Sequence, residues 1–171
     1  MIKIRSEISD DIPLIRHVHQ QAFQPRHNEA RLVDLLREAN KASFSLVALS
    51  NDQIVGHVLF SPVSFVPRQP MIRGLGLAPI AVLPEFQNQG IGGKLIVEGL
   101  QVCKHNGYDL SVVLGNPHYY SRFGFSRARD YQLDNEYGAT DDFMAIEFRA
   151  GIFGRVKGLV KYQPEFKEAD C

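Results

Sequence analysis

The sequence has no excess of charge of either sign. Its 171 residues include 19 Lys and Arg against 19 Asp and Glu, so the formal net charge is zero. A neutral chain has no overall field that would attract nucleic acid or an acidic membrane surface. We therefore expect neither a nucleic-acid partner nor a membrane partner.

Cysteine is also scarce. The two cysteines, Cys103 and Cys171, lie in no pattern with zinc-ligand spacing. His17 and His19 are two apart on a predicted helix, so they point to nearly opposite faces and cannot share one ion. We expect no bound metal, and the low cysteine count suits a reducing compartment.

Long apolar runs are missing as well. The longest, residues 74–84, has about half of the roughly 20 residues that cross a bilayer, and it contains glycine and proline. The N-terminus carries charge from its third residue and lacks the apolar core of a secretory signal. With 44% hydrophobic and 22% charged residues, the chain is expected to be a soluble, cytoplasmic protein with a single domain over 1–171.

Hydrophobic periodicity predicts a mixed α/β chain. Strands are predicted where apolar residues alternate with polar ones, where they run continuously, or where residue types common in strands gather. These segments are 2–5, 45–49, 54–60, 75–83, 110–114 and 143–148. Helical spacing predicts helices from Ser9 to about Phe23, over 30–36 and over 90–104, with a short helical turn from Pro117. Ser9 is the expected N-cap of the first helix. The run 75–114 reads as strand, helix, strand, which is a βαβ unit.

A glycine-rich loop lies between the buried strand 75–83 and the helix that follows. Its sequence, QNQGIGGK over 87–94, has glycines at 90, 92 and 93, which leave the backbone open to a ligand. The unpaired amides and the positive dipole end of the helix then favour an anion such as a pyrophosphate. A tight turn with no ligand is the alternative.

Two common phosphate motifs do not fit this loop. A Walker loop needs Ser or Thr after its Lys to bind magnesium, but Leu95 follows Lys94. A dinucleotide-binding GxGxxG motif that starts at Gly90 would need a third glycine at position 95, where Leu95 stands. The context of strand, loop and helix therefore carries the anion-site hypothesis.

The run IAVLPEFQNQGIGGKL over 80–95 resembles the acyl-CoA-binding segment of the GNAT superfamily of N-acetyltransferases. A second, independent match is YYSRFGF over 119–125, similar to the tyrosine that the family places four residues before Gly and Phe. Segments 54–63 and 160–166 extend the resemblance to a bacterial subgroup of predicted acetyltransferases. It implies a mixed, mostly antiparallel central sheet of about seven strands with helices on both faces.

The resemblance also implies where acetyl-CoA binds. Backbone groups of one strand would pair with the pantetheine chain, the loop amides would hold the pyrophosphate, and a polar residue after the next strand would meet the CoA arm. The corresponding residues are Ile80, Ala81 and Val82 on the strand, Gln87, Asn88, Gln89, Gly90, Ile91, Gly92, Gly93 and Lys94 in the loop, and Asn116.

Two residues are candidates for proton transfer. Tyr120 aligns with the family's tyrosine, and its phenol would protonate the departing CoA sulfur as a general acid. Its alternative role is aromatic packing. The strand 75–83 contains no Asp, Glu or His, so the base is sought elsewhere. Glu29 would accept the amine's proton through water, or would only stabilise the start of a helix.

Together these features predict an enzyme that transfers an acetyl group from acetyl-CoA directly to a primary amine, a small molecule or a peptide, in a ternary complex. The alternatives are a noncatalytic acyl-CoA-binding or regulatory module with the same fold and a generic nucleotide-binding domain. The C-terminal segment can complete the sheet within one chain or across two, so a homodimer is compatible with the sequence.

Overall fold

A computed structural model describes residues 1–171, and the chain divides into two compact units. The first unit comprises Met1–Ser61, Ala78–Gly99 and Pro164–Cys171, and the second comprises Pro62–Leu77 and Leu100–Gln163. Strands β3 (Gln53–Val66) and β4 (Gly74–Val82) and helix α3 (Ile91–His105) run from one unit into the other. No helix is long and apolar enough to span a membrane.

The first unit contains an antiparallel arrangement of β1 (Ile2–Ser6), β2 (Phe44–Ser50) and β3. The turn between β2 and β3 is made by Asn51 and Asp52, with φ of 49° and 64°. Two successive positive φ angles suit the twist of a tight hairpin, and Asn and Asp tolerate them better than most residues. The predicted hairpin is therefore confirmed.

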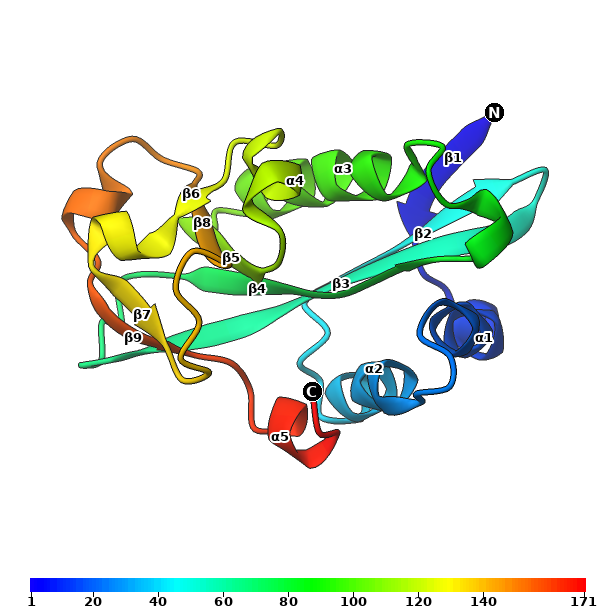
Figure 1. Ribbon diagram of the computed structural model, residues 1–171, viewed down its shortest axis with the longest axis horizontal. Coiled ribbons are helices and arrows are strands. Elements are labelled where there is room, and N and C mark those ends of the chain that lie inside the picture. The colour runs from blue at the N-terminus through cyan, green and yellow to red at the C-terminus, as the bar shows by residue number, and fades with distance from the viewer. The chain divides into compact units, whose positions relative to one another are not determined.

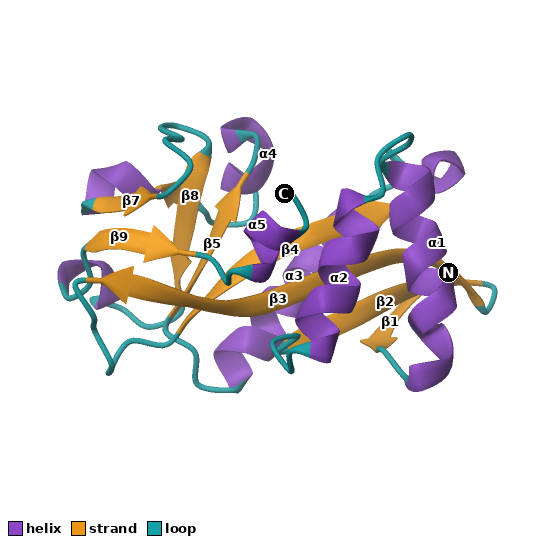
Figure 2. Cartoon of the chain, turned by 90° about the horizontal axis from the view of Figure 1, so that it is seen from below, coloured by secondary structure: helices purple, strands orange, loops and turns teal.

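Helices cover both faces of the strands in the first unit, with α3 on one side and α1 (Ile12–Ala22) and α2 (Asn28–Glu38) on the other (Figures 1 and 2). Successive residues of a strand point to opposite faces. A Cβ atom on Gly56 would lie 3.0 Å from the side chain of Leu95 in α3, whereas the next residue, His57, contacts His19 in α1.

Glycine also sets how closely α3 approaches the strands. A Cβ atom on Gly99 would lie 2.5 Å from the ring of Phe60, a fully buried residue of β3.

The start of α1 is anchored by Asp11 and not by the expected Ser9. The Asp11 carboxylate accepts the Ile8 amide at 2.8 Å and pairs with Arg5 at 2.6 Å.

The second unit holds the remaining strands. Strand β4 pairs in parallel with β5 (Leu110–Leu114), which pairs antiparallel with β8 (Phe143–Glu147), and β8 pairs with β6 (Ser126–Arg127). Strand β9 (Gly158–Lys161) pairs with the end of β3 and with β7 (Leu133–Asn135). The parallel β4 and β5 joined through α3 confirm the predicted βαβ unit.

The sheet is mixed and mostly antiparallel, as expected, but it has nine strands and not about seven. Strands β6, β7 and β9 have two, three and four residues, too few to show a period in the sequence. The short helices are α4 (Pro117–Ser121) and α5 (Glu165–Glu168), with 3-10 turns at Ser9–Asp11, Pro84–Phe86, Ala128–Tyr131 and Ile152–Gly154.

A chain of hydrogen bonds is buried in the first unit. His19 Nε2 lies 2.8 Å from His57 Nδ1, His57 Nε2 lies 2.7 Å from Ser45 Oγ, and Ser45 donates to Glu7, which also binds Arg37. Burial lowers the pKa of both fully buried histidines. Although burial opposes it, hydrogen bonds from His57, Arg37 and Ser45 lower the pKa of Glu7 to about 2.

This arrangement sets the direction of each hydrogen bond in the chain when both histidines are neutral. An ionised Glu7 can only accept, so Ser45 donates to it and accepts from His57 Nε2. His57 Nδ1 then accepts the proton of His19 Nε2. His19 Nδ1, which is buried without a partner, carries no proton. Both imidazoles are neutral in the folded protein.

We expect the folding stability to fall as the pH drops below 6.5. Unfolded histidines take up protons there, while His19 and His57, whose pKa values are lowered in the fold, stay neutral. For each histidine that stays neutral in the fold, stability falls by up to about 1.4 kcal/mol per pH unit below 6.5, which a comparison of pH 7.5 with pH 5.5 reveals. Below pH 4.5, unfolded Glu7 also gains protons before the folded form does.

Urea unfolding at pH 7.5 and at pH 5.5 measures the effect of the two histidines. His57→Gln should flatten the slope and exposed His17→Gln should not; equal slopes in both variants would contradict the assignment.

Candidate active site

The glycine-rich loop is shaped by its own side chains. After β4, Leu83 donates its amide to the Val55 carbonyl at 2.8 Å, which holds the end of the strand. The side-chain amide of Gln87 donates to the Val82 carbonyl at 3.0 Å, and that of Gln89 donates to the Glu85 carbonyl at 3.3 Å. The first bond ties the exposed loop to the end of the strand, and the second closes the loop on itself.

The loop ends in an open helix terminus. The Lys94 amide is the first to bond back along α3, to the Gly90 carbonyl at 3.1 Å. The amides of Ile91, Gly92 and Gly93 precede it and have no carbonyl within the helix. Gly92 and Gly93 carry no side chain that would cover these donors. Three amides, the dipole of a 15-residue helix and the neighbouring Lys94 can therefore attract an anion.

Gly90 is required for its conformation and not for space. Its φ is 82°, a left-handed value, and a Cβ atom there would meet nothing within 4 Å. Side chains disfavour this region of backbone space, whereas glycine enters it freely. Asn88, with φ of 62°, uses the tolerance of Asn for the same region. The reversal of the chain before α3 depends on these two residues.

The predicted strand contacts lie in the first unit with the loop. Ile80 and Val82 are half-buried and Ala81 is buried, as expected for a strand whose residues alternate between two faces. The Val82 carbonyl is already bonded to Gln87. This bond joins the end of the strand to the loop.

Tyr120 and Asn116 lie in the second unit. Asn116 caps α4: its Oδ1 accepts the amides of His118 at 2.8 Å and Tyr119 at 3.4 Å. A residue before a proline at the helix start commonly has this role. The capping bonds engage the side-chain oxygen of Asn116 and leave its NH2 group for other contacts.

The Tyr120 ring is held on three sides. Tyr119 and Phe125 pack against it edge to face, with centroids 5.1 and 5.7 Å away, and a Cβ atom on Gly115 would lie 2.3 Å from its Cε2. The side chain is 8% exposed, and burial raises the pKa of Tyr120 to about 12. The phenol is therefore fully protonated at neutral pH, as a proton donor must be. The role of Gly115 in leaving space for this ring was not predicted, because nothing in the sequence distinguishes it from an ordinary loop glycine.

Glu29 stands in the first turn of α2 and pairs with Arg26 at 3.2 Å. Its side chain is 12% exposed, and its Oε2 is buried without a hydrogen-bond partner. The C-terminal segment packs against the same end of α2, where Asn28 and Arg31 donate to the carbonyls of Asp170 and Glu168. Glu29 thus has a structural partner in Arg26 and one oxygen that remains available to a proton.

The arginines near Tyr120 are engaged in other contacts. Arg122 lies over the ring of Tyr119 at 4.6 Å, and Arg127 and Arg129 both pair with Asp141. Arg127 and Arg129 therefore have carboxylate partners, whereas Arg122 has an aromatic one. No group of three or more His, Cys, Asp or Glu side chains in the chain is placed to hold a metal ion.

Comparison with known proteins agrees with these features. Residues 3–128 match the family model of the acetyltransferase (GNAT) domain. The uncharacterized N-acetyltransferase YhbS of Escherichia coli is 35% identical over 165 residues, which are 95% of this chain and 97% of YhbS. The crystal structure of YhbS in complex with CoA has a TM-score of 0.91 and 34% identity, and covers 97% of this chain and 92% of that one.

A second solved structure is similar over the same extent. It is a GNAT family acetyltransferase from Brucella melitensis in complex with acetyl-CoA, with a TM-score of 0.81, 36% identity and coverage of 97% of this chain and 98% of that chain. The loop, the strand and the Tyr120 motif thus occur in a chain whose relatives along its whole length are acetyltransferases. This chain belongs to the GNAT acetyltransferase family.

Proposed function

We propose that this protein transfers the acetyl group of acetyl-CoA directly to a primary amine, with both substrates bound together. The observation that carries the proposal is the set of three amides at the start of α3 that have no carbonyl partner within the helix. Two of them belong to glycines, which have no side chain that would cover the donors. Relatives that were crystallised with CoA and acetyl-CoA support the choice of coenzyme. We also propose that the two units act as one domain, because the residues assigned below come from both.

The coenzyme would be held mainly by backbone groups. Within residues 87–94, the open amides of Ile91, Gly92 and Gly93 bind the pyrophosphate, because the amides of Gln87 and Lys94 are already bonded to the carbonyls of Pro84 and Gly90. Backbone groups of residues 80–82 pair with the pantetheine arm. The NH2 group of Asn116 is an additional donor to that arm. Binding through amides and a helix dipole requires little basic charge, which suits a chain whose net charge is zero.

The transfer itself needs two proton movements. The amine nitrogen attacks the thioester carbonyl carbon and forms the new C–N bond, and the C–S bond then breaks. The Tyr120 phenol gives its proton to the departing CoA sulfur. The proton lost by the amine passes through water to Glu29. The high pKa of Tyr120 keeps the donor protonated until the thiolate forms.

Calorimetry tests the coenzyme site. We expect acetyl-CoA and CoA to bind with micromolar Kd, and pantetheine, which lacks the pyrophosphate, to bind at least 100-fold more weakly. ATP and NAD at equal concentration should not displace CoA. Pantetheine binding as tightly as CoA, or no binding of CoA at millimolar concentration, would refute the assignment of the loop.

A free-thiol assay tests the catalysis. Acetyl-CoA is incubated with polyamines, amino acids and peptides with free N-termini, and amine-dependent release of CoA is measured. We expect release with at least one class of amine and none with the N-acetylated form of the same compound. CoA binding without release in any of these reactions would favour the noncatalytic acyl-CoA-binding module.

A further inference from the structure

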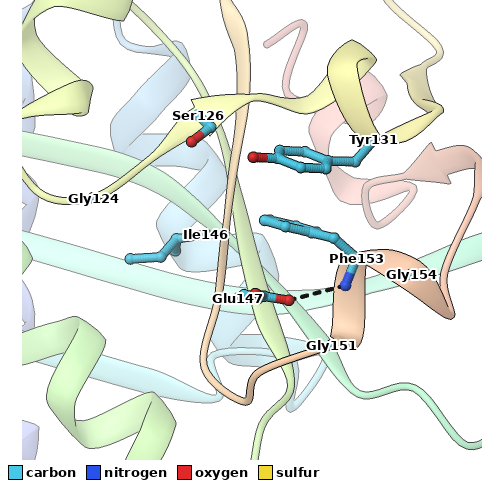
Figure 3. Close-up of a pocket in the computed structure, with 8 residues that line it drawn as sticks. All are labelled: Gly124, Ser126, Tyr131, Ile146, Glu147, Gly151, Phe153 and Gly154. Atoms are coloured by element: carbon cyan, nitrogen blue, oxygen red, sulfur yellow. Dashed lines mark hydrogen bonds between the residues drawn. The ribbon is translucent and has the colours of Figure 1, made fainter.

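A cavity in the second unit is lined by none of the residues assigned to the transfer reaction. Its volume is about 510 Å³, within the roughly 300 to 1,000 Å³ typical of small-molecule sites. It is formed by the turn before β6, the end of β8 and the 3-10 turns at 128–131 and 152–154. Its lining consists of Gly124, Ser126, Tyr131, Ile146, Glu147, Gly151, Phe153 and Gly154 (Figure 3).

One wall of the cavity is an aromatic pair. The rings of Tyr131 and Phe153 are stacked, with centroids 4.0 Å apart and an interplanar angle of 14°. The two residues come from different 3-10 turns, so the stack joins the turns and fixes the wall. Figure 3 shows the phenol oxygen of Tyr131 directed toward the hydroxyl of Ser126. This side of the cavity is therefore lined by two aromatic rings and by two residues that carry a hydroxyl group.

The cavity has a single charged residue, Glu147. Its Oε2 accepts the Phe153 amide at 3.0 Å, which holds the carboxylate at the base of the aromatic wall (Figure 3). The side chain is half-buried, and no Lys, Arg or His lines the cavity. A carboxylate that accepts one hydrogen bond from a neutral donor has further lone pairs, so it can also bind a cation.

Glycines keep the opening clear. Cβ atoms on Gly151 and Gly154 would meet nothing within 4 Å, so these positions present bare backbone beside the carboxylate. Ile146 adds an apolar contact on the strand next to Glu147. The lining thus offers one negative charge, two hydroxyls and limited apolar surface, a combination that matches a cation carried on a hydroxylated skeleton.

We propose that this cavity binds a small hydroxylated amine, whose ammonium group pairs with Glu147 and whose hydroxyl groups meet Ser126 and Tyr131. The ligand is bound and not consumed there, because the cavity contains no residue assigned to acetyl transfer. The inference does not depend on that reaction and holds whether or not the transfer takes place.

Three compounds with a six-membered ring separate the contributions. Glucosamine carries the ammonium and the hydroxyls, glucose replaces the ammonium by a hydroxyl, and cyclohexylamine keeps the ammonium alone. We expect NMR titration of the full-length protein at pH 7 to give millimolar or tighter binding of glucosamine and at least tenfold weaker binding of the other two. Glucosamine binding no tighter than either analogue would overturn the proposal.

A matched pair of variants locates the site. Glu147→Gln removes the charge but retains an oxygen for the Phe153 amide, and it should weaken glucosamine binding at least tenfold without changing glucose binding. Exposed Glu98→Gln on α3 removes the same charge elsewhere and should change nothing. Tyr131→Phe should weaken glucosamine binding a few-fold. Thermal unfolding of each variant checks folding, and unchanged glucosamine affinity in folded Glu147→Gln would disprove the site.

Discussion

Replacing Tyr120 with phenylalanine is expected to lower kcat about 100-fold while changing the Kd for CoA by less than about twofold. General acids contribute roughly 100-fold to 10,000-fold to such reactions, and the lost group is one phenol on a ring that stays in place. Tyr120 packs its ring against Tyr119 and Phe125, and its backbone is bonded to Asn116 and Phe125, so none of these contacts uses the phenol. Steady-state kinetics with calorimetry on the same preparation measures both quantities.

The neighbouring tyrosine provides the control. Tyr119→Phe removes a phenol one residue away, from a half-buried ring in contact with Tyr120 and Phe123, and it should keep at least half of the wild-type kcat. Equal losses of kcat in the two variants, or a Tyr120→Phe variant that loses CoA affinity as much as turnover, would assign Tyr120 to packing. Because the pKa of Tyr120 is about 12, its deprotonation should not limit the rate between pH 7 and 10.

Gly90→Val is expected to weaken CoA binding by roughly 5-fold to 30-fold. A β-branched residue at φ of 82° costs about 1 to 2 kcal/mol, and 1.4 kcal/mol corresponds to a tenfold change in affinity. Relaxation of this strain would rotate the Gly90 carbonyl away from Lys94 and shift the amides that follow. Calorimetric titration with CoA measures the loss.

Gly138→Val is the matched control for that variant. Gly138 has a φ of 71°, and a Cβ atom there also meets nothing within 4 Å, but the residue lies in the loop between β7 and β8. We expect a similar fall in thermal stability and no change in CoA affinity. A loss of affinity of the same size in both variants would mean that the effect is global and not local to the loop.

Much of the fold could be predicted because its longer elements carry a local signal. The hairpin at Asn51 and Asp52 and the helix after Gly90 are examples, since turn chemistry and helical spacing are visible in a single sequence. Strand β3 continues through Pro62 to Val66, beyond its predicted end at Phe60. Proline is typical of a strand end, whereas the pairing of Ser64–Val66 with the distant β9, which supports the extension, is not visible in the sequence.

The site was predictable in part for the same reason. Glycines at a helix start indicate free amides without any tertiary information, so residues 90–93 could be selected once the strand before them and the helix after them were predicted. The bonds of Gln87 to Val82 and of Asn116 to the α4 amides depend on the path of the backbone. The position of Tyr120 over Gly115 depends on it as well. Side-chain identity does not encode such contacts, and the family resemblance supplied the roles.

The glutamine bonds that shape the loop also affect how fast it should bind a ligand. A segment already tied to its own strand has little disorder left to lose, so recognition begins from a nearly finished receptor. Its donors are peptide groups and not mobile lysines. Association should therefore be rapid and should depend only weakly on ionic strength.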